Sequence, residues 1–507
     1  MDIVQDVITH AGGFASLALH RSAYVPNDQE AVAIREAADE LRVLADSLSE
    51  NDSISPAAAT ALAKQITLHD ALVAPCRRLP PEILSEIFLL ALPEDWERGY
   101  AGIRVLNIAR VCVSWRYIAL KTPRIWTSLR FGPETNPLAN HISALRDELD
   151  KTAQAPLELV IDMDLDNMRF PDFEPPRFDE VWSDEAWALL CAQSHRLRYL
   201  DLNKVPMTAY SKLAECTFPR LEVLLIGVCE DDDDKAIRLP IDAFSQAEKI
   251  TDLCIGYATP ILTFELPRMW PLTELNLSST ESSFLGPSID AILSCSATLR
   301  VCHVTAEERA TEPVVRTPTV FPHLEMLSLS HYAITLCYAF TVPNLQTLDL
   351  TSLPEPSVDQ FDALKSMLVR SGDCKALHSL SLEALEPSPD AGDAIDCLSH
   401  IRHLRKLALK NNQWTEEESL LSLRLIQPLV RDPAVPASMS FLPHLTHLVV
   451  DFGLRDVDAH DPEFGSALSD VLKSRRTVRT VGGVELALLE HFETNGGEAD
   501  CRWPPPA

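Results

Sequence analysis

A hexapeptide of the pattern L-x-x-L-x-L, with other aliphatic residues allowed at the leucine positions, recurs between residues 197 and 450. The copies begin at Leu197, Leu221, Ile250, Leu272, Leu299, Leu324, Leu345, Leu377, Leu404 and Leu445. Consecutive side chains of a strand point to opposite faces, so the aliphatic residues of each copy fit one buried face. The pattern predicts a series of short parallel strands, each too small to bury its apolar side without a neighbour.

The spacing of the copies resembles that of leucine-rich repeats, whose period is roughly 20–29 residues. The first two copies start 24 residues apart, although Leu404 and Leu445 are 41 apart. The resemblance covers about residues 157–489, with a first strand at Leu157. It implies an α/β fold in which short parallel strands form an irregular solenoid and helices cover the outer face. Segments between the hexapeptides have helical or irregular character, and examples are AFSQAEKI, IDAILSCSA and FDALKSMLV.

Residues 1–75 precede this region and have helical patterns. Ile34, Leu41 and Leu48 are seven residues apart and form one apolar stripe. A second helix is predicted to begin at Ser55-Pro56, because serine favours the N-cap and proline the first helical position. We expect both helices to brace the next part of the chain, with a contact to a second copy as the alternative.

The stretch RRLPPEILSEIFLLAL, residues 77–92, is unusually apolar for an acidic protein. Its paired prolines and Glu82 suit a helix start, and the following apolar residues have helical spacing. A second apolar helix is predicted in VLNIARVCVSWRYIALKTP, and Pro123 ends it. So short a segment cannot bury all of this surface within itself. We expect part of it to dock on a partner.

Three blocks in this region resemble the F-box, in its order and at about its separations. They are L-P-P-E-I-L at residues 79–84, V-C-V-S-W-R at 111–116 and T-P-R-I-W at 122–126. The wider resemblance is to F-box proteins of the kind common in fungi, in which helices precede the box and leucine-rich repeats follow. The domains expected are a helical region at 1–75, the F-box at 76–131, repeats at 132–490 and a tail at 491–507.

The resemblance implies the role of particular residues. The leading Leu-Pro and the first helix would contact a Skp-type adaptor, which ties F-box proteins to a cullin. The adaptor-binding residues implied are Leu79, Pro80, Pro81, Ile83, Leu84, Ile87 and Phe88. The residues implied to hold the box together are Val111, Cys112, Trp115 and Trp126.

The composition limits the classes of partner that the chain is expected to bind. A formal net charge of −30 does not suit nucleic acid or an anionic membrane, since those partners need clustered Lys and Arg; it favours basic proteins. The 12 cysteines form no C-x-x-C pair, as expected for reduced thiols inside cells. Asp2 and Asp6 are untypical of a signal peptide, and no apolar run reaches the roughly 18 residues of a membrane span. We expect a soluble protein of the cytoplasm or nucleus.

No pattern of a nucleophile elbow, P-loop or dinucleotide-binding loop occurs, so we expect a non-catalytic protein without a cofactor. The acidic run at residues 230–234 lacks the spaced ligands and glycine of a calcium loop. Cys191 and His195 lack a second ligand pair at zinc spacing, so no metal site is predicted.

Two functions remain open. The first is the substrate-recognition subunit of a Skp-cullin-F-box type ubiquitin ligase, whose repeats bind the protein to be ubiquitinated. The second is a repeat scaffold for protein interaction without degradation. Polar strand residues between the buried leucines are the predicted substrate face, namely Arg198, Glu222, Asp252, Glu274, Arg300 and Glu325.

Overall fold

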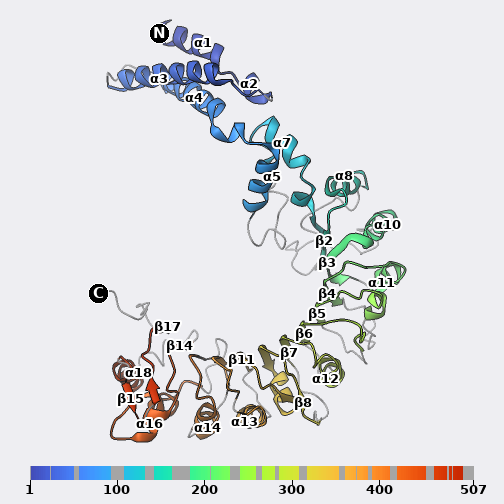
Figure 1. Cartoon of the computed structure of the whole chain (residues 1–507), viewed down its shortest axis with the longest axis vertical. Helices are drawn as coiled ribbons and strands as arrows, with labels where there is room; N and C mark the ends of the chain where they lie inside the picture. The colour runs from blue at the N-terminus through green and yellow to red at the C-terminus, as the bar shows by residue number, and fades with distance from the viewer. Residues whose placement is uncertain are drawn as a thin grey trace, which may run out of the picture. The chain divides into compact units, whose positions relative to one another are not determined.

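The computed structural model describes residues 2–22, 24–50, 56–92, 108–131, 142–162, 183–205, 207–228, 240–257, 265–279, 285–307, 317–352, 360–372, 374–385, 391–411, 420–452, 462–476, 479–481 and 484–494. It is a mixed α/β structure with N-terminal helices and a large sheet of parallel strands. The chain divides into two compact units, and Figure 1 follows both from blue to red. The first unit is residues 1–160 with 179–189, and the second is 161–178 with 190–507.

The first unit is mainly helical. Its elements are α1 Asp2–Phe14, α2 Leu17–Arg21, α3 Asp28–Glu50, α4 Pro56–Val73, η1 Pro75–Arg78, α5 Pro81–Leu90, α7 Val113–Leu120, η2 Pro123–Trp126, β1 Ser128–Phe131 and α8 Ile142–Thr152. Strand β2 (Leu157–Asp162) and helix α10 (Asp184–Cys191) lie at its boundaries with the second unit. The two N-terminal helices predicted from the sequence are confirmed as α3 and α4.

The apolar stripe of α3 packs inside the unit. Leu41 and Leu62 are buried together with Ala11 of α1, and Leu44, Leu48 and Ile66 lie against them. On α4, Gln65 donates a hydrogen bond of 2.7 Å to the carbonyl of Ala15. The three helices therefore bury the stripe among themselves.

The second unit contains a row of parallel strands, and a connecting segment leads from each strand to the next one in the row. Its strands are β3 Leu197–Val205, β4 Val223–Val228, β5 Asp252–Tyr257, β6 Glu274–Ser279, β7 Val301–Ala306, β9 Met326–His331, β11 Thr347–Thr351, β12 Ser379–Glu383, β13 Lys406–Lys410, β14 His447–Asp451 and β17 His491–Thr494. They neighbour one another in this order. Each predicted hexapeptide contributes one of these strands. The sheet also extends beyond the predicted repeat boundary at 490, because β17 pairs in parallel with β14.

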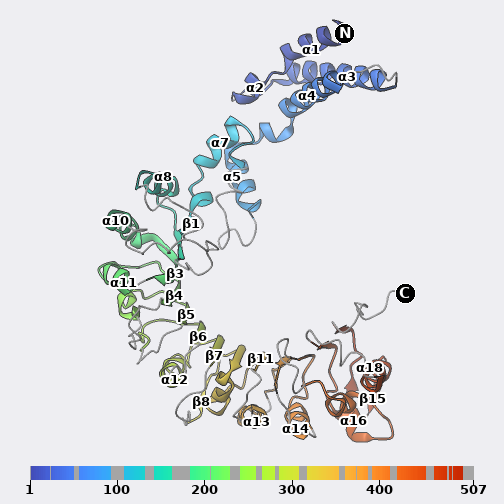
Figure 2. The same cartoon turned by 180° about the vertical axis from the view of Figure 1, so that it is seen from behind.

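The connections between these strands contain helices and short side elements. They are α11 Met207–Leu213, η5 Pro240–Phe244, α12 Leu285–Ser294, β8 Thr319–Val320, η6 Tyr332–Tyr338, β10 Phe340–Thr341, α13 Gln360–Arg370, α14 Gly392–His400, α15 Leu423–Ile426, η7 Gln427–Leu429, α16 Pro436–Ser440, α18 Pro462–Ser474, β15 Arg479–Val481 and β16 Val484–Leu486. The short helix η4 (Ser194–Arg196) directly precedes β3. Two predicted segments form α12 and α13, whereas AFSQAEKI forms only the end of η5 and a turn. Figures 1 and 2 show α11 to α14 along one side of the row of strands.

The register places equivalent hexapeptide residues side by side. Leu348 of β11 pairs with Leu327 of β9 and Leu380 of β12, and all three are buried. Their neighbours in sequence, such as Thr347, are partly exposed, so the strands alternate between a buried and an open face. The buried face is the one that the aliphatic positions of the pattern predicted.

Two buried arginines hold the C-terminal strands and helices together. Arg475 donates hydrogen bonds to the carbonyls of Leu429, Leu442 and Phe441, at 2.7, 3.0 and 3.1 Å. Arg431 donates to the carbonyls of Ala487 and Pro443, at 2.7 and 3.0 Å. Burial lowers the pKa of Arg475, and Arg431 adds to this effect. The guanidinium groups donate to several loop carbonyls at once and so link the loops around the end of the sheet.

We predict that Leu348→Ala lowers the free energy of unfolding by about 2–5 kcal/mol, because it leaves a cavity between two repeats. The adjacent Thr347→Ala on the open face should change it by less than about 0.5 kcal/mol. Urea denaturation followed by far-UV circular dichroism measures both. Equal losses in the two variants would contradict the assignment of buried and open faces.

Candidate adaptor-binding site

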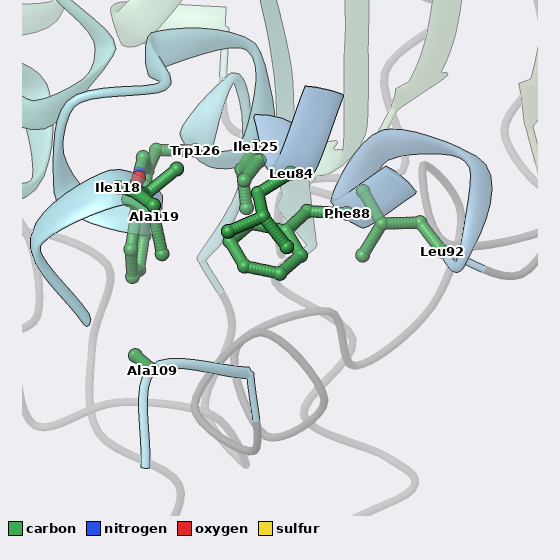
Figure 3. Close-up of a cluster of buried hydrophobic side chains, with 8 residues drawn as sticks. All are labelled: Leu84, Phe88, Leu92, Ala109, Ile118, Ala119, Ile125 and Trp126. Atoms are coloured by element: carbon green, nitrogen blue, oxygen red, sulfur yellow. The ribbon is translucent and has the colours of Figure 1, made fainter. Parts of the chain in front are cut away.

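The segment from η1 to β1 is a small helical domain with its own core. The core consists of Leu84, Phe88, Leu92, Ala109, Ile118, Ala119, Ile125 and Trp126. Figure 3 shows Leu84 and Phe88 of α5 beside Ile125. Leu79, Leu89, Ile108 and Trp115 pack around this cluster and remain partly exposed. Short helices from three parts of the segment thus close on one apolar centre.

Helix α5 begins where the two prolines predict it. Pro80 is the N-cap residue, with φ −55° and ψ 147°, and Pro81 occupies the first helical position. Glu82 lies in the first turn, where its negative charge is favoured by the helix dipole. The side chains of Pro80 and Pro81 are exposed, and Leu79 is partly buried against the core. The entry to α5 is therefore rigid and faces solvent.

The aliphatic residues of α5 divide between two faces. Leu84 and Phe88 are 2% and 1% exposed, whereas Ile83 and Ile87 are 49% and 40% exposed. Leu90, which the predicted site omitted, is 84% exposed. Ile83, Ile87 and Leu90 have the spacing i, i+4, i+7 of one helical face. We call these three residues the α5 stripe.

The buried pair departs from the sequence-based prediction. Leu84 and Phe88 were assigned to the adaptor contact together with their exposed neighbours, but here both lie inside the domain core. The ring centroids of Phe88 and Trp115 are 4.9 Å apart. We therefore reassign Leu84 and Phe88 to the support of α5. The physical reason is that both faces of this helix are apolar, so spacing alone could not tell which face is covered.

Helix α7 carries a second exposed apolar face. Val113, Tyr117 and Leu120 are exposed and have the same i, i+4, i+7 spacing. We call them the α7 stripe. The sequence analysis missed this set because it followed the other apolar stripe of the same helix. A search for a second apolar periodicity would have found it.

The four residues predicted to hold the domain together have different environments. Trp126 is buried and its indole N–H donates 2.8 Å to the carbonyl of Ala119. Trp115 lies against Phe88 at the edge of the core. Cys112 is the N-cap of α7, and its Sγ accepts a hydrogen bond from the backbone of Trp115 at 3.4 Å. Val111 is 61% exposed and is not a core residue, because it lies in the bend before that cap.

A pair of hydroxyl groups joins α5 to the end of α7. The Oγ of Ser85 lies 3.0 Å from Oγ1 of Thr122, and each is also within hydrogen-bond distance of a carbonyl one turn back in its own segment. Neither residue was singled out from the sequence. Hydroxyls this close to helix carbonyls are common and give no distinctive sequence signal.

The N-terminal helices are connected to the start of this domain. Arg77 of η1 donates to the carbonyl of Tyr24 at 3.3 Å and lies 3.0 Å from Nδ1 of His20. Nε2 of His20 lies 2.7 Å from the carbonyl of Leu68. Burial lowers the pKa of His20, and the Arg77 charge lowers it further. Arg78 forms a 3.0 Å ion pair with Asp28, so α3 and α4 are tied to the segment that precedes α5.

Residues 76–132 match the family model of the F-box-like domain. The core and both exposed stripes lie within this F-box-like domain. No curated protein matches the chain. An F-box-like domain suggests a role in F-box-mediated protein interaction, and F-box domains typically bind Skp-type adaptors.

The predicted substrate-face residues lie in two rows of the second unit. The first row is the second hexapeptide position, at the strand starts, and it contains Arg198, Glu222, Arg300 and Glu325. The second row lies one position later, where Asp252 and Glu274 pair in register. Arg198 pairs with Glu222 at 3.1 Å and Arg300 with Glu325 at 2.8 Å. Their contact with a substrate stays a prediction. The four charges in the first row compensate one another.

Two further observations concern the described part of the chain. No helix within it is long and apolar enough to cross a membrane. In the same ranges, no three His, Cys, Asp or Glu side chains are grouped as metal ligands would be. The acidic run at 230–234 lies outside the described residues.

We predict that Phe88→Ala destabilises the domain much more than Ile87→Ala does. Phe88→Ala removes a fully buried ring and should destabilise the domain by about 3–5 kcal/mol, whereas Ile87→Ala should cost less than about 1 kcal/mol. Amide hydrogen exchange of peptides covering residues 81–90 and 113–126 in the full chain reports this locally. Unchanged exchange in Phe88→Ala would show that its ring does not support the core.

Proposed function

We propose that this chain is the substrate-recognition subunit of a Skp-cullin-F-box type ubiquitin ligase. The observation that carries the proposal is the α5 stripe, an exposed apolar face on the F-box-like domain directly after the rigid Pro80-Pro81 entry. Exposed aliphatic residues in a row are the surface that a protein partner covers. In this proposal the partner is a Skp-type adaptor, which links the chain to a cullin.

The contact with the adaptor is refined by the burial of the side chains. Leu79, Pro80, Pro81, Ile83 and Ile87 are exposed or partly exposed, and Leu90 extends their surface by one turn. Leu84 and Phe88 would support this surface from inside the core, because they hold α5 against α7. The α7 stripe supplies further apolar surface for the same partner. Anchors of this kind usually carry most of the binding free energy of an interface.

The parallel strands support the second half of the proposal. Each strand of the large sheet from β3 to β14 comes from one hexapeptide, and equivalent residues are in register across this sheet. We propose that this unit is a leucine-rich-repeat solenoid whose open face binds the protein to be ubiquitinated. The chain would have no chemistry of its own and would act in the cytoplasm or nucleus by holding lysines near a ubiquitin-charged enzyme.

We predict that Ile83→Ser with Ile87→Ser weakens binding to a purified Skp-type adaptor by about tenfold or more, because it removes two exposed anchors. Isothermal titration calorimetry with the full chain measures the affinity. The matched control is Val32→Ser with Val43→Ser on α3, since these aliphatic residues are also exposed. Equal affinity of the Ile83/Ile87 variant and the wild type would overturn the assignment of the adaptor surface.

A separate experiment distinguishes a ligase subunit from a scaffold without degradation. Cells expressing the intact chain or the Ile83→Ser/Ile87→Ser variant are treated with a proteasome inhibitor, and proteins bound to the repeats are isolated. A ligase subunit should accumulate bound proteins carrying ubiquitin, and the variant should lose the ubiquitin while keeping the proteins. Bound proteins without ubiquitin in both samples would favour the scaffold.

A further inference from the structure

The last strands of the sheet carry a row of basic side chains at their N-terminal ends. The backbone N–H of Arg405 donates to the carbonyl of His378, and the N–H of Thr446 donates to the carbonyl of Arg405, each at 2.9 Å. One position later, Lys406 pairs in register with His447, which in turn pairs with His491. Neighbouring strands are about 4.8 Å apart, so these side chains are adjacent although they are distant in sequence.

The positions directly beside Arg405 and Lys406 on the adjacent strands carry no carboxylate, and Glu490 lies one strand further along the row. Arg198 and Arg300 occupy the same hexapeptide position as Arg405, and each has a carboxylate of the next strand as its partner. The corresponding neighbours of Arg405 are His378 and Thr446. Lys406 lies between Ser379 and His447. In the ranges that the structure describes, neither Arg405 nor Lys406 forms an ion pair with a carboxylate.

Histidine rings lie beside these two cations. His403 and His444, in the turns before β13 and β14, stack with ring centroids 5.9 Å apart and planes 4° apart. His447 lies 5.6 Å from His491 on the next strand. We call His403, Arg405, Lys406, His444 and His447 the basic corner. Its Arg and Lys side chains and His403 are exposed, and the other two rings are partly buried.

The cations beside His444 and His447 help to lower the pKa values of these two rings. Burial lowers the pKa of His444, and His403, Arg405 and Arg431 lower it further, while Glu485 opposes them. Burial also lowers the pKa of His447, with Lys406 and His491 adding to the effect and Glu490 opposing it. Both rings are therefore held toward the neutral form, in a positive local field that an added anion would relieve.

We propose that the basic corner binds an acidic segment of a partner protein, rich in Asp and Glu. Charge complementarity carries this choice, because the chain has a net charge of −30 and yet gathers unpaired cations here. Arg405 and Lys406 are exposed side by side at the start of β13, and His444 and His447 extend the corner to β14, so a segment with several carboxylates can follow it across two strands. A single phosphate would favour donors that converge on one point. The inference rests on the proposed function only in taking this partner to be the protein that is ubiquitinated.

The test uses a fluorescein-labelled peptide of alternating Glu and Ser and the full chain, with binding followed by fluorescence anisotropy at low salt. We expect Arg405→Glu with Lys406→Glu to weaken binding by about tenfold or more. The matched control is Arg220→Glu with Lys249→Glu, which changes the net charge equally at two exposed cations of the second unit outside the predicted substrate face. It should bind the peptide like the wild type, and circular dichroism confirms the fold of each variant.

Three outcomes would overturn the proposal. They are no binding of the peptide to the wild type, equal losses in the two charge-reversed variants, and tighter binding of a phosphoserine peptide or an RNA than of the Glu peptide. Adaptor binding is measured on the same variants and should be unchanged. Loss of peptide binding with retention of adaptor binding therefore separates this inference from the proposed ligase function, which is tested by adaptor binding and by ubiquitin on the bound proteins.

The pH dependence gives a second readout that a purely structural role would not produce. Because a bound carboxylate raises the pKa of His444 and His447, binding takes up protons and should strengthen severalfold from about pH 8 to about pH 6. In His444→Gln with His447→Gln this dependence should flatten while binding at about pH 8 is retained. A pH profile identical to the wild type's would show that these rings do not face the peptide.

Discussion

The second unit depends on the burial of aliphatic side chains between consecutive strands. The fourth hexapeptide position forms one continuous buried row: Leu200, Leu224, Leu253, Leu275, Cys302, Leu327, Leu348, Leu380, Leu407 and Leu448. No single strand could cover its member of this row, so each repeat is stabilised by its two neighbours. Phe492 of β17 continues the row, and the buried arginines after β13 hold the loops around its end. Stability in this unit is therefore a property of the stack.

The need to bury apolar side chains also shapes the F-box-like domain, but there one apolar face stays uncovered. Its short helices have two apolar faces, but the domain is too small to cover both. The Phe88 face closes on Trp115 and Ile125, and the α5 stripe stays open. Burial of one face fixes the direction in which the other points. The core of this domain thus positions the surface that a partner would use.

Charge is distributed unevenly on this acidic chain. Across the strand starts, Arg198 and Arg300 are each neutralised by the next strand, so those parts of the sheet present little net charge. Within the described ranges, Arg405 and Lys406 of the basic corner form no such ion pair, and their charge is opposite to that of the whole chain. Overall repulsion combined with local attraction would make binding there selective for a segment that can reach the corner. Net charge alone, which pointed to basic partners, does not describe this site.

The sequence by itself determined the strands, because an alternating aliphatic pattern has one strand-like interpretation and its copies are in phase. It also located the small helical domain, because three blocks in a fixed order are more specific than any one of them. It could not decide between the faces of α5, where Leu84 and Ile83 are equally apolar and only packing against Ile125 covers one of them. The basic corner was equally hidden, because Lys406, His447 and His491 become neighbours only when the parallel register brings distant strands together. Periodicity determines local structure, whereas exposure and charge depend on which distant segments come into contact.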